Sequence, residues 1–157
     1  MRKLLIFFLI LVSCFNSYSQ QLLDTDGLNN INNVYLTALK EYCAELDSAK
    51  VHTVYVRRDH FIGESWPKEI HGIKVEYLES QDDYIKAIKR QGGTATIVGI
   101  GPFNFSNGKF YVAVIPFAAG YKKRDVSMSN GGGLTVYFRY DLQNEGFVFE
   151  HKKWTGI

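Results

Sequence analysis

Residues 94–117, TATIVGIGPFNFSNGKFYVAVIPF, indicate the class of fold more clearly than any other stretch of the chain. Two runs rich in β-branched and aromatic residues flank Ser106-Asn107-Gly108, and Asn-Gly between such runs is the strongest short signal of a β-hairpin. Apolar and polar residues then alternate from Leu134 to Tyr140, which predicts a half-buried strand. A last strand is predicted at Phe147–Trp154, and the segment from Lys122 to Gly133 between the strands is predicted to be a polar loop.

The N-terminal half shows two helical patterns. Asn33 is a candidate N-cap for a helix over 33–48, whose apolar residues recur at spacings of three and four. A shorter helix follows Ser80, which forms a capping box with Asp83, and Gly92 is placed to end it in a left-handed conformation. Strands are predicted at 51–57 and 73–78, on either side of an irregular segment.

The predicted fold class is α+β. We expect a mostly antiparallel sheet of about five or six strands, with the N-terminal helix and the second, short helix packed on one face. The chain shows no internal repeat and no low-complexity tract.

The first nineteen residues are predicted to be a signal peptide. Arg2 and Lys3 precede the apolar run 4–12, which is too short to cross a bilayer, and small and polar residues follow it. Residues 11–14, Leu-Val-Ser-Cys, also resemble a bacterial lipobox, so the sequence leaves open whether Cys14 is lipidated or removed with the signal. Either route predicts export, to the periplasm or the surface of a bacterium, with membrane attachment only if Cys14 carries a lipid.

The rest of the chain is predicted to be a polar lead-in, residues 20–32, and a single domain, residues 33–157. Without Arg2 and Lys3, the 18 basic residues become 16 and equal the 16 acidic residues. A domain without net charge has no electrostatic signature of nucleic-acid binding, so we expect no nucleic-acid partner, and no transmembrane span in the mature protein. Cys43 is then the one remaining cysteine, which predicts a domain held by its core without an internal disulfide.

The sequence contains no recognisable catalytic motif, and we expect no catalytic residue, metal or cofactor. Cys43 lies in the apolar stripe of the first helix, which is typical of a core cysteine. Asp59, His60, Glu64 and His71 lie near one another in the irregular segment, and a hydrolase built on these four residues is an alternative hypothesis.

The leading hypothesis is a binding module that recognises a protein partner, as an inhibitor or an immunity-type protein does. The irregular segment is too long for a simple connection and contains Arg57, Arg58, Phe61 and Trp66, residue types that are frequent at binding hot spots. The sequence does not show whether Trp66 belongs to the core or to the surface. A further alternative is a small-ligand-binding domain with an aromatic-lined pocket between the sheet and the first helix. The partner, the ligand and the oligomeric state are not predicted.

Overall fold

The computed structural model describes residues 33–122 and 125–156. The predicted signal peptide (1–19), the lipobox-like residues 11–14 and the lead-in (20–32) lie outside the described residues.

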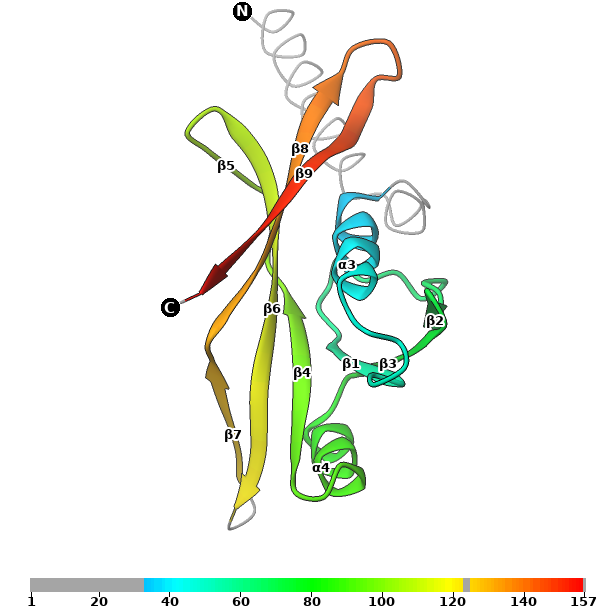
Figure 1. Ribbon diagram of the computed structural model, residues 1–157, viewed down its shortest axis with the longest axis vertical. Helices are drawn as coiled ribbons and strands as arrows, with labels where there is room; N and C mark the ends of the chain where they lie inside the picture. The colour runs from blue at the N-terminus through cyan, green and yellow to red at the C-terminus, as the bar shows by residue number, and fades with distance from the viewer. Residues whose placement is uncertain (1–32, 123–124, 157) are drawn as a thin grey trace, which may run out of the picture.

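Two helices and one large sheet make up the described part of the chain (Figure 1). The helices are α3 (Val34–Ala44) and α4 (Gln81–Arg90). The strands are β1 (Thr53–Arg57), β2 (Glu69–Ile70), β3 (Ile73–Leu78), β4 (Thr94–Ile100), β5 (Asn104–Ser106), β6 (Lys109–Lys122), β7 (Asp125–Asn130), β8 (Gly132–Asp141) and β9 (Gly146–Gly156).

The sheet is mixed, and it has nine strands within the described residues. Its order is β2-β3-β1-β4-β6-β8-β9, and β5 and β7 also pair with β6. β1 is parallel to β3 and to β4, whereas the other pairs are antiparallel. The prediction of a mostly antiparallel sheet with five or six strands was therefore wrong. The chain crosses from β3 through α4 to β4, and such a strand–helix–strand crossover joins parallel strands.

The two helices pack against opposite faces of the sheet, so the prediction that they share one face was also wrong. Val54 and Val56 belong to the core cluster that includes α3, whereas Tyr55 between them packs with Ala87 and Ile88 of α4. Successive side chains of a strand point to opposite faces. We call the two faces the α3 face and the α4 face.

The predicted helix ends are confirmed for α4 and partly for α3. Ser80 and Asp83 form the capping box, and the positive φ of Gly92 (76°) follows the last turn of α4. At α3, the side chain of Asn33 accepts a hydrogen bond from the backbone N–H of Tyr35 at 2.8 Å. The helix stops at Ala44 and not at residue 48, because Asp47 forms a turn in which its side chain accepts a hydrogen bond from the backbone of Ala49.

The predicted Asn-Gly hairpin is present between β5 and β6. Asn107 and Gly108 both have positive φ (52° and 75°), as a two-residue type I′ turn requires. The strand expected before it is interrupted at residues 101–103, so that β4 and β5 are separate strands on the same edge of β6.

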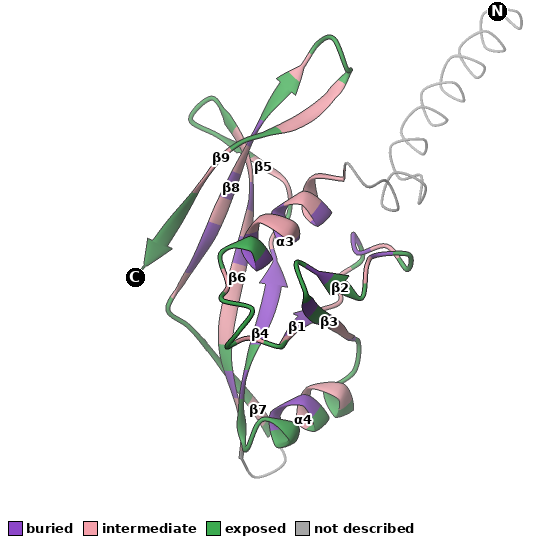
Figure 2. Cartoon of the chain, turned by 45° about the vertical axis from the view of Figure 1, so that its right-hand side comes forward, coloured by how far each residue is buried: buried purple, intermediate pink, exposed green. Residues whose placement is uncertain are grey.

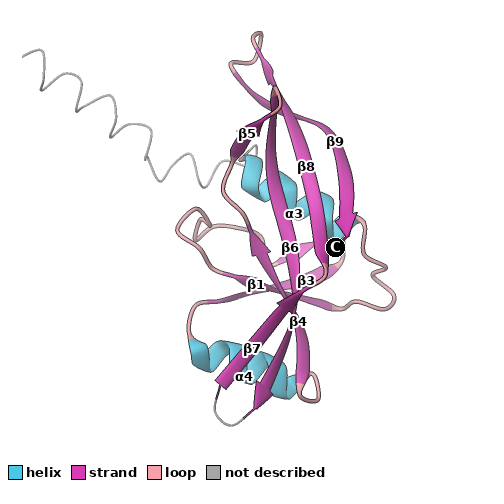
Figure 3. Cartoon of the chain, turned by 90° about the vertical axis from the view of Figure 1, so that its left-hand side faces the viewer, coloured by secondary structure: helices cyan, strands magenta, loops and turns pink. Residues whose placement is uncertain are grey.

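The segment predicted to be a polar loop contains a strand. β6 extends to Lys122, and β7 returns along it (Figure 3). The sequence of β7, DVSMSN, shows no apolar alternation because most of its side chains are exposed at the sheet edge.

Trp66 lies in the core and is 3 % exposed, with its ring edge-on to Tyr77 at 6.3 Å between centroids. We predict that Trp66→Ala lowers the free energy of unfolding by roughly 3–5 kcal/mol, because it leaves a large cavity in packed surroundings. A thermal melt should show a decrease of about ten degrees. The matched control is Trp154→Ala, since Trp154 is 45 % exposed and should cost only a few degrees. Equal losses in the two variants would contradict this assignment.

Candidate functional site

The aromatic residues of the predicted recognition segment lie inward. Phe61 is buried and stacks on Tyr35 of α3, with ring centroids 4.4 Å apart, and Trp66 packs in the same core cluster. These two side chains join the irregular segment to the rest of the domain, and the structure places neither of them on an open surface.

The two arginines of that segment form separate ion pairs. The guanidinium of Arg57 donates to the carboxylate of Asp59 through Nε (3.1 Å) and Nη2 (3.0 Å). Arg58 donates to Glu79, the residue that follows β3. Arg57, Arg58, Phe61 and Trp66 therefore do not form one continuous patch.

Three of the four residues of the hydrolase hypothesis line a shallow hollow. Asp59, His60 and Glu64 surround a space of about 450 Å³ together with Arg58, Ile62 and Glu79, at the carboxyl ends of β1 and β3. His71 lies in the turn before β3, at the opposite end of that strand. In the described part of the chain, no three His, Cys, Asp or Glu side chains are close enough together to hold a metal ion.

A trough begins beyond the end of α3 and crosses the α3 face, and between the diverging strands β1 and β4 it also reaches Tyr55 and Gln91 on the α4 side. It consists of two hollows of about 600 and 560 Å³, which share Thr96 and Ala118 in their lining. The first hollow opens where β1 and β4 diverge, because these strands pair at Tyr55–Ile97 and Val56–Val98, while β4 begins at Thr94.

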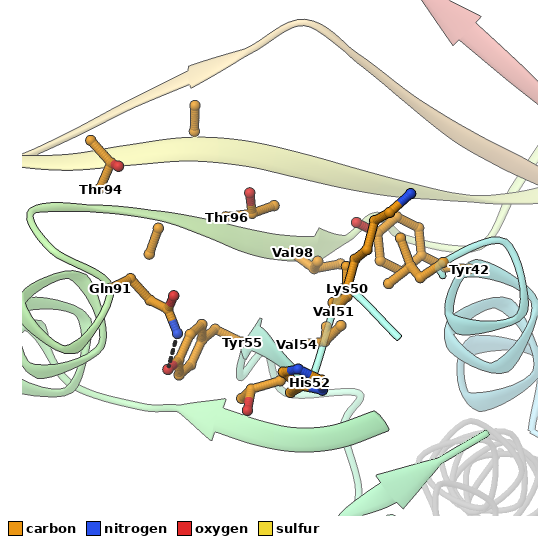
Figure 4. Close-up of a pocket in the computed structure, with 14 residues that line it drawn as sticks. Tyr42, Lys50, Val51, His52, Val54, Tyr55, Gln91, Thr94, Thr96 and Val98 are labelled. Carbon is orange, nitrogen blue, oxygen red and sulfur yellow. Dashed lines mark hydrogen bonds between the residues drawn. The ribbon is translucent and has the colours of Figure 1, made fainter. Parts of the chain in front are cut away.

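Figure 4 shows the side chains around the first hollow. Thr94 and Thr96 project from β4, and Tyr42 and Lys50 lie at one end. At the other end, the side-chain amide of Gln91 donates a hydrogen bond to the hydroxyl of Tyr55 at 3.3 Å.

The second hollow extends the trough to Trp154 of β9 and to the chain between β7 and β8. The Trp154 ring lies 5.9 Å from that of Tyr42, centroid to centroid, so the two rings lie on the same side of the trough. Lys152 anchors this part of β9 to α3, because its ammonium lies 2.9 Å from Glu41 Oε2 and 2.7 Å from Glu45 Oε1. Its hydrogen bond, together with its charge, lowers the pKa of Glu45.

A row of four phenylalanines crosses the other end of the same face. Phe105 is opposite Phe110, Phe110 is opposite Phe138, and Phe138 is opposite Phe149, on β5, β6, β8 and β9 in turn. Phe103 and Phe147 pack beside the row, with rings 4.7 Å apart. We call these side chains, with Tyr140 and Leu142, the aromatic end.

The aromatic end is exposed at its margins. Phe105 is 62 % exposed, Phe149 40 %, Tyr140 47 % and Leu142 83 %. The two hairpins that bear these residues project at the same end of the molecule, away from α4 (Figure 1), and their tips are open to solvent (Figure 2). This surface was not predicted from the sequence, because the alternation that marks a strand does not show how far a helix covers the apolar side of that strand.

Comparisons with protein-family models, curated proteins and solved structures find no match to this chain. Among the described helices, neither has the length and apolar character needed to cross a membrane.

Cys43 is buried, as predicted, and burial raises the pKa of its thiol from 9.0 to about 12. Burial and the neighbouring Cys43 also raise the pKa of Tyr42 from 10.0 to about 12. A thiol that stays protonated at neutral pH is a weak nucleophile, which favours a structural role.

These raised pKa values predict that stability falls at alkaline pH. Between about pH 9 and 12 the unfolded chain loses the protons of Cys43 and Tyr42 while the folded protein keeps them, so the free energy of unfolding decreases as pH rises. Urea unfolding at pH 8 and at pH 10.5 measures the effect. Cys43→Val removes one of the two groups and should make the decrease smaller. A free energy of unfolding that is constant or rises over this interval would contradict the prediction.

Proposed function

We propose that the protein is an exported, non-enzymatic binding module that recognises a protein partner through the aromatic end. The observation that carries the proposal is the row of phenylalanines in register across four strands, with its margins exposed. Inhibitors and immunity-type proteins act in this way, by surface complementarity and without chemistry of their own.

The architecture of the aromatic end supports a binding role. The inner members of the row are fixed, since Phe138 is 2 % exposed and Phe103 stacks on Phe110 at 5.6 Å between centroids. The outer members, Phe105 and Phe149, are therefore held on a rigid base, which lowers the entropy lost on binding. Large apolar side chains that are exposed together on a folded domain are typical of an interaction surface.

The chemistry of this surface favours a protein over other partners. Phenyl and leucyl side chains have no hydrogen-bond donors with which to select a sugar or a nucleotide, whereas aromatic residues are enriched at the core of protein interfaces. The domain after the predicted signal has no net charge, so it has no overall electrostatic attraction to an anionic membrane.

The hydrolase alternative has less geometric support. His71 lies at the other end of β3 from Glu79, in the turn that precedes the strand, and is thus separated from Asp59, His60 and Glu64. Catalysis by these four groups requires them to converge on one substrate atom.

Photo-crosslinking in the native host tests the proposal. The photoreactive residue p-benzoylphenylalanine in place of Phe105 should form an adduct with a distinct protein. The same residue in place of Met128 should not, because Met128 is 39 % exposed but lies on β7 at the far end of the sheet.

The captured protein is then purified and titrated against three forms of the module. Phe105→Ser should weaken binding at least tenfold, because truncating a hot-spot aromatic costs about 2 kcal/mol or more. Met128→Ser should bind as the unchanged module does. Adducts with a second copy alone or with lipid alone, or undiminished affinity of Phe105→Ser, would overturn the proposal.

A further inference from the structure

The trough beyond the end of α3 is a second surface, separate from the aromatic end. We infer that it binds a neutral oligosaccharide, in an extended form that runs from the Gln91–Tyr55 end to Trp154. The inference does not depend on the identity of any protein partner.

The trough exists because small side chains form its floor. Thr96, Ala118 and Ser129 lie on neighbouring strands of one face, since Thr96 is opposite Ala118 and Ala118 is opposite Ser129. All three are exposed, and their side chains are too short to fill the hollows above them. A ligand can therefore approach the sheet closely over several residues, on a floor fixed by strand pairing.

The lining consists of hydroxyl, amide and apolar groups. None of the described residues that line the two hollows is an aspartate or a glutamate, although the chain contains 16 acidic residues. The basic residues of the lining are Lys50 and His52, and the ammonium of Lys50 lies 3.2 Å from the carboxylate of Asp47. Because the lining has neither carboxylates nor a cluster of free cations, its charge complements a ligand that has no net charge. The polar groups are those of Tyr42, Thr53, Tyr55, Gln91, Thr94, Thr96, Ser129, Asn130 and Thr155.

One exposed aromatic ring completes the match to a sugar. Trp154 flanks the trough and is 45 % exposed, and it packs 5.9 Å, centroid to centroid, from the buried ring of Tyr42. A pyranose ring presents C–H groups on its face, which pack on an aromatic ring, and hydroxyls at its edge, which pair with donors and acceptors such as those of Thr96 and Gln91. The two hollows, of about 600 and 560 Å³, are of the size that ligand pockets usually have.

Calorimetric titration of the purified protein tests the inference. The probes are neutral hexasaccharides of glucose, N-acetylglucosamine, mannose and xylose, and at least one of them should bind saturably. Trp154→Ala should weaken that binding at least tenfold. Thr96→Phe, at an exposed strand position that tolerates an aromatic residue, should fill the trough and also weaken binding at least tenfold without a large change in melting temperature.

Phe105→Ser is the matched control, because it alters the aromatic end and leaves the trough intact. It should bind the sugar as the unchanged protein does, so that failure of this inference and failure of the proposed function are distinguishable. Three results would overturn the inference: no saturable binding of any probe, sugar binding that survives both Trp154→Ala and Thr96→Phe, or preferential binding of an uncharged Ala/Ser/Thr octapeptide that Thr96→Phe blocks.

Discussion

The pairing of β6 on both of its edges is the constraint on which the remaining structure depends. On one edge, β4 pairs with the middle and end of β6 and β5 pairs with its start; on the other edge, β8 pairs with its first half and β7 with its second half. β6 thus fixes the positions of the four strands that pair with it. The two faces of β6 also determine which side chains lie under α3 and which lie under α4. A one-residue shift in this register would exchange the two faces.

Close backbone approaches at the β7–β8 turn follow from this arrangement. β7 pairs with the second half of β6, and β8 pairs with the first half of the same edge. The short turn between β7 and β8 therefore lies close to β6, and β9 pairs with β8 from the other side. A Cβ on Gly132 would lie 2.4 Å from the carbonyl oxygen of Thr155, and a Cβ on Gly133 would lie 2.8 Å from that of Val114. Gly132 also has φ of 133°, which side chains rarely tolerate. Gly132 and Gly133 therefore have a structural explanation, which the sequence alone does not indicate.

How far the sequence predicts this fold depends on whether each signal is local. The capping box at Ser80, the N-cap at Asn33 and the Asn107-Gly108 turn were predicted correctly, because each depends on contacts within a few residues. The parallel pairing of β1 was not predicted, since it brings Tyr55 beside Ile97 and depends on where the crossover through α4 returns. The opposite placement of the helices follows from the same crossover. A strand such as β7 is not detectable from periodicity when both of its faces are largely exposed.

The two tryptophans show why the exposed surfaces were harder to predict than the fold. Trp66 lies in a long irregular segment and Trp154 in a predicted strand, and the tryptophan of the irregular segment is the more natural candidate for an exposed contact. In the structure the segment with Trp66 packs inward, because its side chains close the core beside α3, while Trp154 lies on β9 at the margin of the sheet. Among the described residues α3 covers the middle of its face, and both the aromatic end and the trough lie where that cover stops. The eleven-residue helix α3 is much shorter than the fourteen-residue strand β6 that it covers, so the apolar side chains under α3 become core and those beyond its ends remain exposed.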